Sequence, residues 1–256
     1  PRVMPRDAQG RRSPRWRRVL VPACVVLVVA AAIAGLIRAG VVRPNNPSRE
    51  QYPVRGVDVS RYQGEIDWPV LAGQDIEFAF IKATEGSNYV DPRFATNLEG
   101  ATAAGLRAGA YHFFSFESAG ATQADNVVRQ VPADPELLPV VVDLEFYGRF
   151  WTDPPPADEL QRELEVLLER LAEHYGKRPI VYTTGEAYNR YLSGGFPEVD
   201  IWIRDVWLAP SLADGRAWTF WQFTDRARLD GYRGEEAFID LNVFAGDRVA
   251  WQAYGR

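Results

Sequence analysis

The 256-residue sequence is poor in the side chains that build disulfides and metal sites. Its single cysteine, Cys24, lies inside an apolar run, so no disulfide can form within the chain and no cysteine-based metal site can be built. The two histidines, His112 and His174, are too few for a histidine-rich metal site. No G-x-G-x-x-G sequence or P-loop follows a predicted strand, which removes the usual reason to expect a nucleotide. We therefore expect neither a metal ion nor a cofactor.

Positive charge is also scarce outside the N-terminus. The net charge is −5, and residues 1–18 alone hold seven arginines against one aspartate, so the rest of the chain is more acidic than the total suggests. An acidic domain argues against nucleic acid as a partner. The hydrophobic fraction of 46% and the aromatic fraction of 12% are typical of a globular protein.

The N-terminal region predicts a membrane segment. Residues 1–18 are expected to form a disordered basic tail in the cytoplasm. Residues 19–37 are an uncharged run that would span about 28 Å as a helix, close to the hydrocarbon thickness of a bilayer. The positive cluster precedes this run, so the positive-inside rule places everything after it outside. We expect a transmembrane anchor. The alternative is a cleaved signal peptide and a secreted protein, because Ala32–Ala34 resembles a cleavage site.

The remainder predicts a linker over 38–53 and one catalytic domain over 54–256. Eight candidate strands cover residues 54–60, 77–83, 107–114, 138–145, 179–183, 200–203, 217–223 and 237–240. Helical patterns cover 92–105, 119–131, 158–175 and 186–192. This alternation indicates βα units and a largely parallel sheet. We expect an α/β fold, an irregular (β/α) barrel with about eight strands and fewer helices. An open doubly wound sheet is the alternative.

The stretch LPVVVDLEF, residues 138–146, runs from apolar residues directly into Asp143 and Glu145. A continuous Val/Leu run predicts a strand buried on both faces, and residues two apart on a strand point to the same side. Two crowded like charges raise at least one pKa, which is how a carboxylic acid stays protonated and serves as a general acid. Taken alone, the motif favours a strand that ends in two solvent-exposed acids.

Active sites of (β/α) barrels form at the carboxyl ends of the strands. Four acids fall at predicted strand ends, and aromatic residues follow several of the others. The acids are Asp58, Asp143, Glu145 and Asp240. Acids flanked by aromatics are typical of a carbohydrate site, because sugar rings stack on aromatic side chains and glycosidic cleavage needs a protonated carboxyl.

Four residues on the predicted strands also have simpler explanations. Turn or cap chemistry explains Asp58 and Asp240 equally well if each is taken alone. His112 is expected to be a hydrogen-bonded core histidine, and Lys82 to be the partner of a buried acid.

Several segments, in this order, resemble the glycoside hydrolase family 25 lysozymes, the Chalaropsis-type N-acetylmuramidases. They are RGVDVSRYQGEIDW, FAFIKATEGSNYVDPRFATNLEGATAAGLRAGAYHFF, LPVVVDLEF, RPIVYTT, FWQFT and IDLNVF. The resemblance covers about residues 54–246. It implies an irregular barrel that cleaves the β-1,4 bond between N-acetylmuramic acid and N-acetylglucosamine in peptidoglycan, without metal or cofactor and with net retention of configuration.

The resemblance also implies roles for single residues. Glu145 would be the catalytic acid/base. Asp143 would be its close partner, which stabilises the substrate's N-acetyl group or the developing positive charge, or acts as a nucleophile. Asp58 and Asp240 match the family's acids at the first and last strands. The residues that would line the glycan groove are Tyr62, Tyr111, Tyr182, Trp202 and Gln222.

Two segments depart from the family pattern. The sixth strand usually reads W-I-A followed by an aromatic, whereas residues 202–207 read W-I-R-D-V-W and bring Arg204 near the groove rim. Residues 147–156 form a proline-rich loop after the acid pair. Both affect the subsites rather than the reaction.

Two other functions remain as alternatives. A non-catalytic peptidoglycan-binding module tethered to the membrane would use the same groove, but the presence of all four acids disfavours it. A chitinase-like hydrolase would show the sequence D-x-x-D-x-D-x-E, which is absent. We expect a monomer whose partners are peptidoglycan glycan strands and the membrane.

Overall fold

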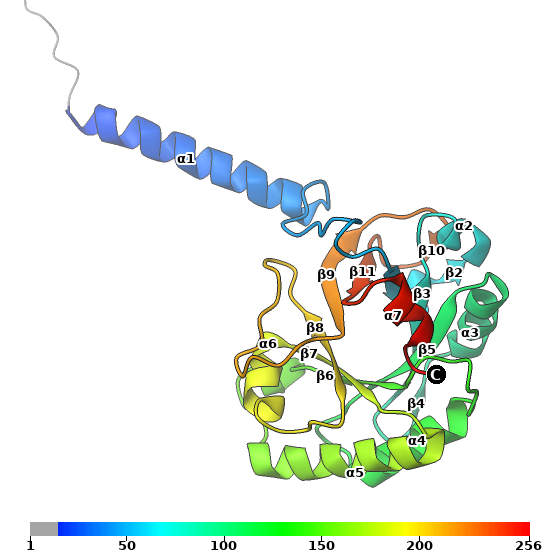
Figure 1. Ribbon diagram of the computed structural model, residues 1–256. Coiled ribbons are helices and arrows are strands. Elements are labelled where there is room, and N and C mark those ends of the chain that lie inside the picture. The colour runs from blue at the N-terminus through cyan, green and yellow to red at the C-terminus, as the bar shows by residue number, and fades with distance from the viewer. Residues whose placement is uncertain (1–14) are drawn as a thin grey trace, which may run out of the picture. The chain divides into compact units, whose positions relative to one another are not determined.

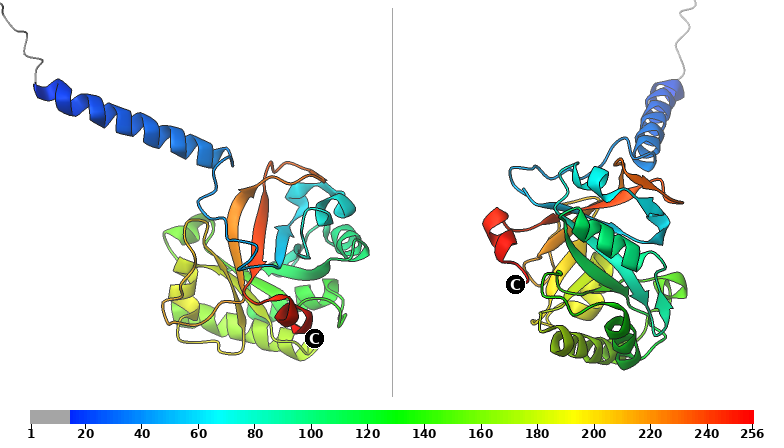
Figure 2. Two further views of the ribbon diagram at one scale, coloured as in Figure 1. Left: turned by 45° about the horizontal axis from the view of Figure 1, so that its top comes forward. Right: turned by 90° about the vertical axis from the view of Figure 1, so that its right-hand side faces the viewer.

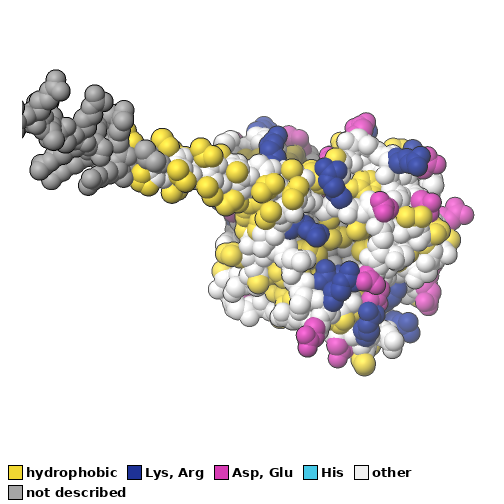
Figure 3. Space-filling model, turned by 90° about the horizontal axis from the view of Figure 1, so that it is seen from above, with side chains coloured by type: hydrophobic (Ala, Val, Ile, Leu, Met, Phe, Trp, Pro, Cys, Tyr) yellow, Lys and Arg dark blue, Asp and Glu magenta, His cyan; other side chains and the backbone are white. Residues whose placement is uncertain are grey.

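The computed structural model describes residues 15–256 (Figure 1). The chain divides after residue 42 into an N-terminal unit and a larger unit, and the predicted tail over 1–18 lies mostly outside the described residues. Helix α1 (Arg15–Arg38) forms most of the smaller unit and carries exposed apolar side chains (Figure 3). Among the described residues no helix combines the length and apolarity needed to cross a bilayer, which takes about 20 apolar residues. The predicted transmembrane helix over 19–37 is therefore not supported.

Eight strands of the larger unit close into a barrel (Figure 1). In sheet order they are β1 (Arg55–Val59), β11 (Ile239–Phe244), β9 (Phe220–Ala227), β8 (Asp200–Arg204), β7 (Ile180–Thr184), β6 (Val141–Leu144), β5 (Arg107–Phe113) and β3 (Phe78–Glu85). A parallel pairing of β1 with β3 closes the ring. All neighbours are parallel except β11, which is antiparallel to both β1 and β9. The predicted eight-stranded barrel is confirmed, with one strand reversed.

Shorter elements complete the larger unit. Strand β4 (Tyr89–Val90) pairs with the end of β3, and β2 (Glu65–Ile66) pairs with β10 (Tyr232–Arg233). The helices are α2 (Trp68–Ala72), α3 (Phe94–Ala103), α4 (Gly120–Gln130), α5 (Ala157–Tyr175), α6 (Gly185–Ala187) and α7 (Arg248–Ala253). Single turns are η1 (Arg61–Gln63), η2 (Gly148–Trp151) and η3 (Tyr188–Leu192). No helix connects β8 to β9, which makes the barrel irregular.

The helix α5 shows how the local sequence determines an element. Its leucines recur three and four residues apart, and all five are buried against the barrel and α4, which lies alongside (Figure 2). Gly176 then takes a left-handed conformation with φ of 65° and ends the helix.

Aromatic side chains fill the barrel interior below one end. Phe80 lies 4.7 Å from Trp202 and 5.3 Å from Phe220, measured between ring centres. A Cβ atom on Gly56 would lie 2.3 Å from the ring of Phe78, so only glycine fits there. These aromatic rings fill the barrel at the end where the parallel strands begin. The inward-pointing acids therefore gather at the other end, where the parallel strands finish.

Candidate active site

The four predicted acids meet at the barrel end where the parallel strands finish. Asp58 lies near the end of β1, Asp143 lies in β6 and Glu145 follows that strand directly. Asp240 is the second residue of β11, and the register places it opposite Asp58. The prediction that Asp240 ends a strand was therefore wrong. It still reaches this mouth, because a reversed strand begins where its parallel neighbours end.

Two amide side chains hold Asp58 and Asp240 together. Gln222 Nε2 donates hydrogen bonds to Asp58 Oδ2 at 3.0 Å and to Asp240 Oδ2 at 3.1 Å. Asn242 Nδ2 donates to the same oxygen of Asp58 at 2.7 Å. Sequence reasoning missed Asn242, although its position two residues after Asp240 places both on one face of the strand.

A second layer orients these two amides. Trp202 Nε1 donates to Asn242 Oδ1 at 2.8 Å, and the hydroxyl of Tyr182 donates to Gln222 Oε1 at 2.9 Å. An indole nitrogen can only donate, so it selects the carbonyl side of Asn242 and turns the amide nitrogen toward Asp58. Trp202 is only 2% exposed. In this structure its indole supports the acids from within the barrel core.

Burial and charge favour one shared proton on the Asp58–Asp240 pair. Burial raises the pKa of Asp240 well above its usual value, and the charge of Asp58 raises it further. Burial also raises the pKa of Asp58, but the hydrogen bonds from Asn242 and Gln222 oppose that shift. The proton therefore resides preferentially on Asp240, which leaves Asp58 ionised.

The second carboxyl pair is Asp143 and Glu145. Asp143 is 7% exposed, and burial followed by the charge of Glu145 raises its pKa well above the usual value. Burial also raises the pKa of Glu145, while Arg204 lowers it and Asp58 raises it. Asp143 Oδ1 is buried without a hydrogen-bond partner among the described residues. Asp143 is thus not the solvent-exposed strand end that the motif alone allowed.

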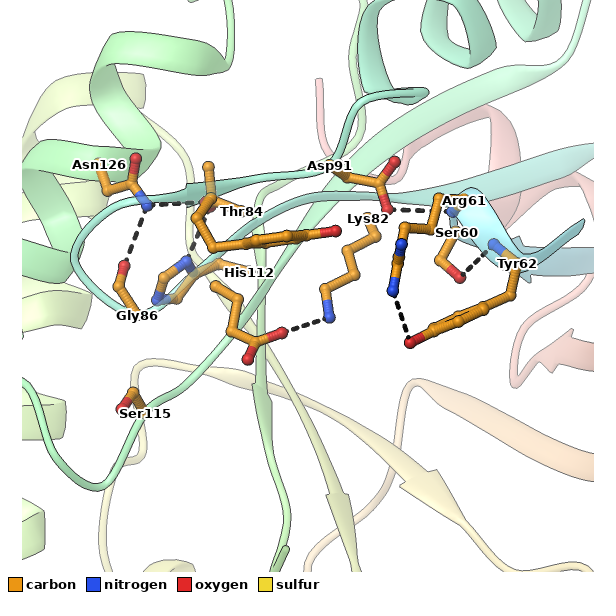
Figure 4. A network of polar contacts seen from close by, with 12 residues as sticks. Ser60, Arg61, Tyr62, Lys82, Thr84, Gly86, Asp91, His112, Ser115 and Asn126 are labelled. Atoms are coloured by element: carbon orange, nitrogen blue, oxygen red, sulfur yellow. Dashed lines mark hydrogen bonds and ion pairs between the residues drawn. The ribbon is translucent and has the colours of Figure 1, made fainter. Parts of the chain in front are cut away.

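Two cations flank this pair. Lys82 Nζ donates to Glu85 Oε2 at 2.7 Å (Figure 4). Lys82 Nζ also lies 5.0 Å from the ring centre of Phe113. Its partner was expected to be a buried acid, but the side chain of Glu85 is 44% exposed. Across the mouth, Arg204 Nη2 donates to Asp225 Oδ2 at 2.8 Å.

Two tyrosines occupy different places at the mouth. Tyr62 is 40% exposed, and its hydroxyl accepts a hydrogen bond from the guanidinium of Arg61 at 3.0 Å (Figure 4). Tyr111 on β5 is half-buried, and its pKa is raised well above the usual value by burial and then by the charges of Asp58 and Asp143. Tyr111 therefore remains a neutral phenol beside the acids.

His112 is the hydrogen-bonded core residue that the sequence predicted. It is fully buried, with Nδ1 2.8 Å from Thr84 Oγ1 (Figure 4). Its Nε2 lies 3.0 Å from Gln123 Oε1. Burial lowers its pKa to about 4, so the ring is neutral. Within residues 15–256, no group of three or more His, Cys, Asp and Glu side chains is arranged to hold a metal ion.

Buried carboxyls with raised pKa values at the mouth of an α/β barrel suit glycosidic cleavage, which uses a pair of carboxyl groups. Residues 57–232 match the family model "Glycosyl hydrolases family 25", and the chain belongs to that family. Lysozyme M1 of Streptomyces globisporus is 32% identical over 75% of this chain and 68% of its own length.

Solved structures agree with this assignment. A family 25 glycosyl hydrolase from Bacillus anthracis is 48% identical, with a TM-score of 0.80 over 84% of this chain and 98% of that one. The bacterial lysozyme from Streptomyces coelicolor is 29% identical, with a TM-score of 0.71 over 79% and 96% of the two chains. The protein is a peptidoglycan hydrolase of the lysozyme type.

Proposed function

We propose that Glu145 protonates the glycosidic oxygen when the enzyme cleaves the β-1,4 bond between N-acetylmuramic acid and N-acetylglucosamine. The observation that carries this proposal is the raised pKa of Glu145 in a partly buried position next to Asp143. No hydrogen bond from another described side chain occupies its carboxyl, so the group is available to the substrate. General acids of this kind contribute about 10²–10⁴-fold to rate.

We infer that Asp143 and Glu145 share one proton, which burial places on Asp143 in the free enzyme and which passes to Glu145 when the glycan binds, so that Asp143 then carries the negative charge. Two carboxyls this close hold one proton more readily than none, and Glu145 gives that proton to the leaving oxygen. The unpartnered Oδ1 of Asp143 is positioned to accept a hydrogen bond from the acetamido N–H or to face the developing positive charge. Either interaction stabilises the transition state on the face opposite the leaving group.

The remaining residues form the walls of the groove. Asp58 and Asp240 occupy the wall across from the acid pair, where Gln222 and Asn242 keep them in place. Tyr62 and Tyr111 reach the surface and contact the glycan. We assign Tyr182, Trp202 and Gln222 to the support beneath it, because each is at most 7% exposed.

The Glu145→Gln variant tests this assignment. It keeps the shape of the side chain but carries no transferable proton, so clearing of a peptidoglycan suspension should slow by about 10²-fold or more. Glu165→Gln, an exposed glutamate on α5, is the matched control and should clear at the wild-type rate. If Glu145→Gln clears the suspension as fast as the control, Glu145 is not the acid.

The products identify the bond. Mass spectrometry of the released fragments should show muramic acid at the reducing end. Glucosamine at the reducing end would mean that a different bond is cleaved and would contradict the proposed specificity.

We further propose that the enzyme acts as a monomer on the outer side of the cytoplasmic membrane. The substrate lies there, and the uncharged run over 19–37 supports export. Cell fractionation tests the location, and size-exclusion chromatography with light scattering tests the oligomeric state. Activity confined to the cytoplasmic fraction, or a stable dimer mass, would contradict these two points.

A further inference from the structure

A cavity of about 520 Å³ lies on the outer face of the barrel wall, between the linker and strands β1 and β11. Arg55 lines it from β1 and Leu241 lines it from β11. Arg55 is three residues from Asp58, and Leu241 is adjacent to Asp240. Since side chains alternate along a strand, each points to the opposite side of the wall from the catalytic acid. The cavity is therefore separate from the active site.

The lining of this cavity is strongly basic. Its charged residues are Arg43, Arg49, Arg55 and Arg228, and none of the lining residues is acidic. Arg49 forms an ion pair with Asp75 outside the cavity. Within the described part of the chain, Arg43 and Arg228 form no ion pair with an acidic side chain. The guanidinium groups of Arg43, Arg55 and Arg228 thus line one cavity without an acidic side chain to balance their charge.

Arg55 is the buried member of this group. It is 9% exposed, one Nη donates to the carbonyl oxygen of Pro47, and the guanidinium lies 5.5 Å from the ring centre of Phe223. Its Nε is buried without a hydrogen-bond partner. Burial lowers the pKa of Arg55, and the charges of Arg49 and Arg43 lower it further. A buried charged donor that lacks an acceptor is unfavourable, and an anion in the cavity would supply one.

The other two arginines are placed to complete such a site. The guanidinium of Arg228 lies 4.6 Å from the ring centre of Phe238, which limits its freedom. Arg43 stands exposed at the rim. The apolar side chains of Ile76, Leu229 and Leu241 form part of the lining, and apolar surroundings strengthen charge pairing.

We propose that this cavity binds a phosphate group, carried as free phosphate or as a phosphate ester. Guanidinium groups bind phosphate through paired hydrogen bonds, and three of them around one hollow suit a group with several acceptor oxygens and up to two charges. A monovalent carboxylate would leave more of the positive charge uncompensated. The site is independent of catalysis, since it lies on the other side of the wall.

Thermal unfolding of the full chain in inorganic phosphate, at constant ionic strength with sodium chloride, tests the proposal. A ligand that binds only the native state raises the midpoint temperature according to its concentration relative to Kd. We expect a saturable rise with phosphate that chloride and acetate do not produce. The double variant Arg43→Gln/Arg228→Gln should lose the rise, with phosphate affinity reduced at least about tenfold.

Arg93→Gln/Arg129→Gln is the matched control. It removes the same charge from two exposed arginines elsewhere, so it should keep the response to phosphate. Both double variants should cleave soluble glycan at the wild-type rate, which keeps this test separate from that of Glu145. The proposal is overturned if phosphate gives no saturable rise beyond chloride, or if Arg43→Gln/Arg228→Gln responds like the control.

Competition then identifies the carrier of the phosphate group. Poly(glycerol phosphate) and phosphatidylglycerol vesicles are each added to the phosphate-bound protein, with phosphatidylcholine vesicles as the control for headgroup charge. Displacement by the polymer indicates a wall polymer, and displacement by the anionic vesicles alone indicates a lipid headgroup. Displacement by neither indicates free phosphate.

Discussion

Arg204 sits next to the proposed catalytic acids at the position where this chain departs from the W-I-A pattern of its family. It extends from the end of β8, pairs with Asp225, and lowers the pKa of Glu145 through its charge. The charge of Asp58 acts on Glu145 in the opposite direction. The proton affinity of the acid therefore depends on a balance between these two neighbours.

Replacement of Arg204 should shift the pH profile of activity. In Arg204→Ala the pKa of Glu145 rises, so Glu145 stays protonated to higher pH and the alkaline limb of kcat/KM moves to higher pH. The check is a pH–rate profile on a soluble glycan, with Arg190→Ala as an exposed control on η3. An unchanged alkaline limb would show that Arg204 does not act on the acid.

Some residues of the site can be predicted from the sequence, and others cannot. The pair Asp143 and Glu145 could be predicted because the two acids lie two residues apart, and side chains two residues apart point to the same side of a strand. The sequence predicted Trp202 in the glycan groove, but an indole at a strand end can face a groove or a core with the same sequence around it. Only its hydrogen bond to Asn242 and its burial place it in the core.

At the scale of elements, the eight strands and the helix α5 follow from hydrophobic period and end signals. The direction of β11 does not, because a strand has the same apolar pattern whichever way it runs. Its antiparallel pairing with β1 and β9 emerges only when the sheet is assembled. That pairing brings Asp240 to the active site from the start of a strand.

The glycine in β1 provides a test at this scale. A Cβ on Gly56 would lie 2.3 Å from Phe78, whose ring has no room to move because Phe80, Phe220 and Trp251 surround it. We expect Gly56→Ala to lower the free energy of unfolding by about 1–3 kcal/mol through overpacking.

Urea unfolding of Gly56→Ala measures the effect. Gly185→Ala is the control, because nothing lies within 4 Å of its Cβ position, and it should unfold like the wild type. Equal stabilities of the two variants would show that the barrel interior accommodates the added methyl group.

At the scale of the whole molecule, the acids of the active site are a stability cost at neutral pH. The pKa values of Asp143 and Asp240 are raised above their unfolded values, chiefly by burial. The stability linked to such groups is fully present below the unfolded pKa of about 4 and is lost as the pH rises through the folded pKa. Function therefore opposes stability in this site.

Asp143→Asn should relieve this cost. The variant should melt at a higher temperature than the wild type at pH 7, and the difference should shrink toward pH 4, where the wild-type carboxyl is protonated. For a domain of this size each kcal/mol gained corresponds to about 2–4 °C. Melting curves at the two pH values, with the exposed Asp158→Asn as control, give the answer. A lower melting temperature of Asp143→Asn at pH 7 would contradict the sign.

The sequence by itself determined the fold class, the family and the acids, because strand period, helix ends and ordered motifs are local properties. Tertiary structure alone decided the reversal of β11, the amide clamp on Asp58 and the basic cavity outside the wall. Each of these joins residues far apart in the chain: Asn242 reaches Asp58, and Arg228 approaches Arg43 and Arg55. Such contacts arise from closure of the barrel, and no local pattern encodes them.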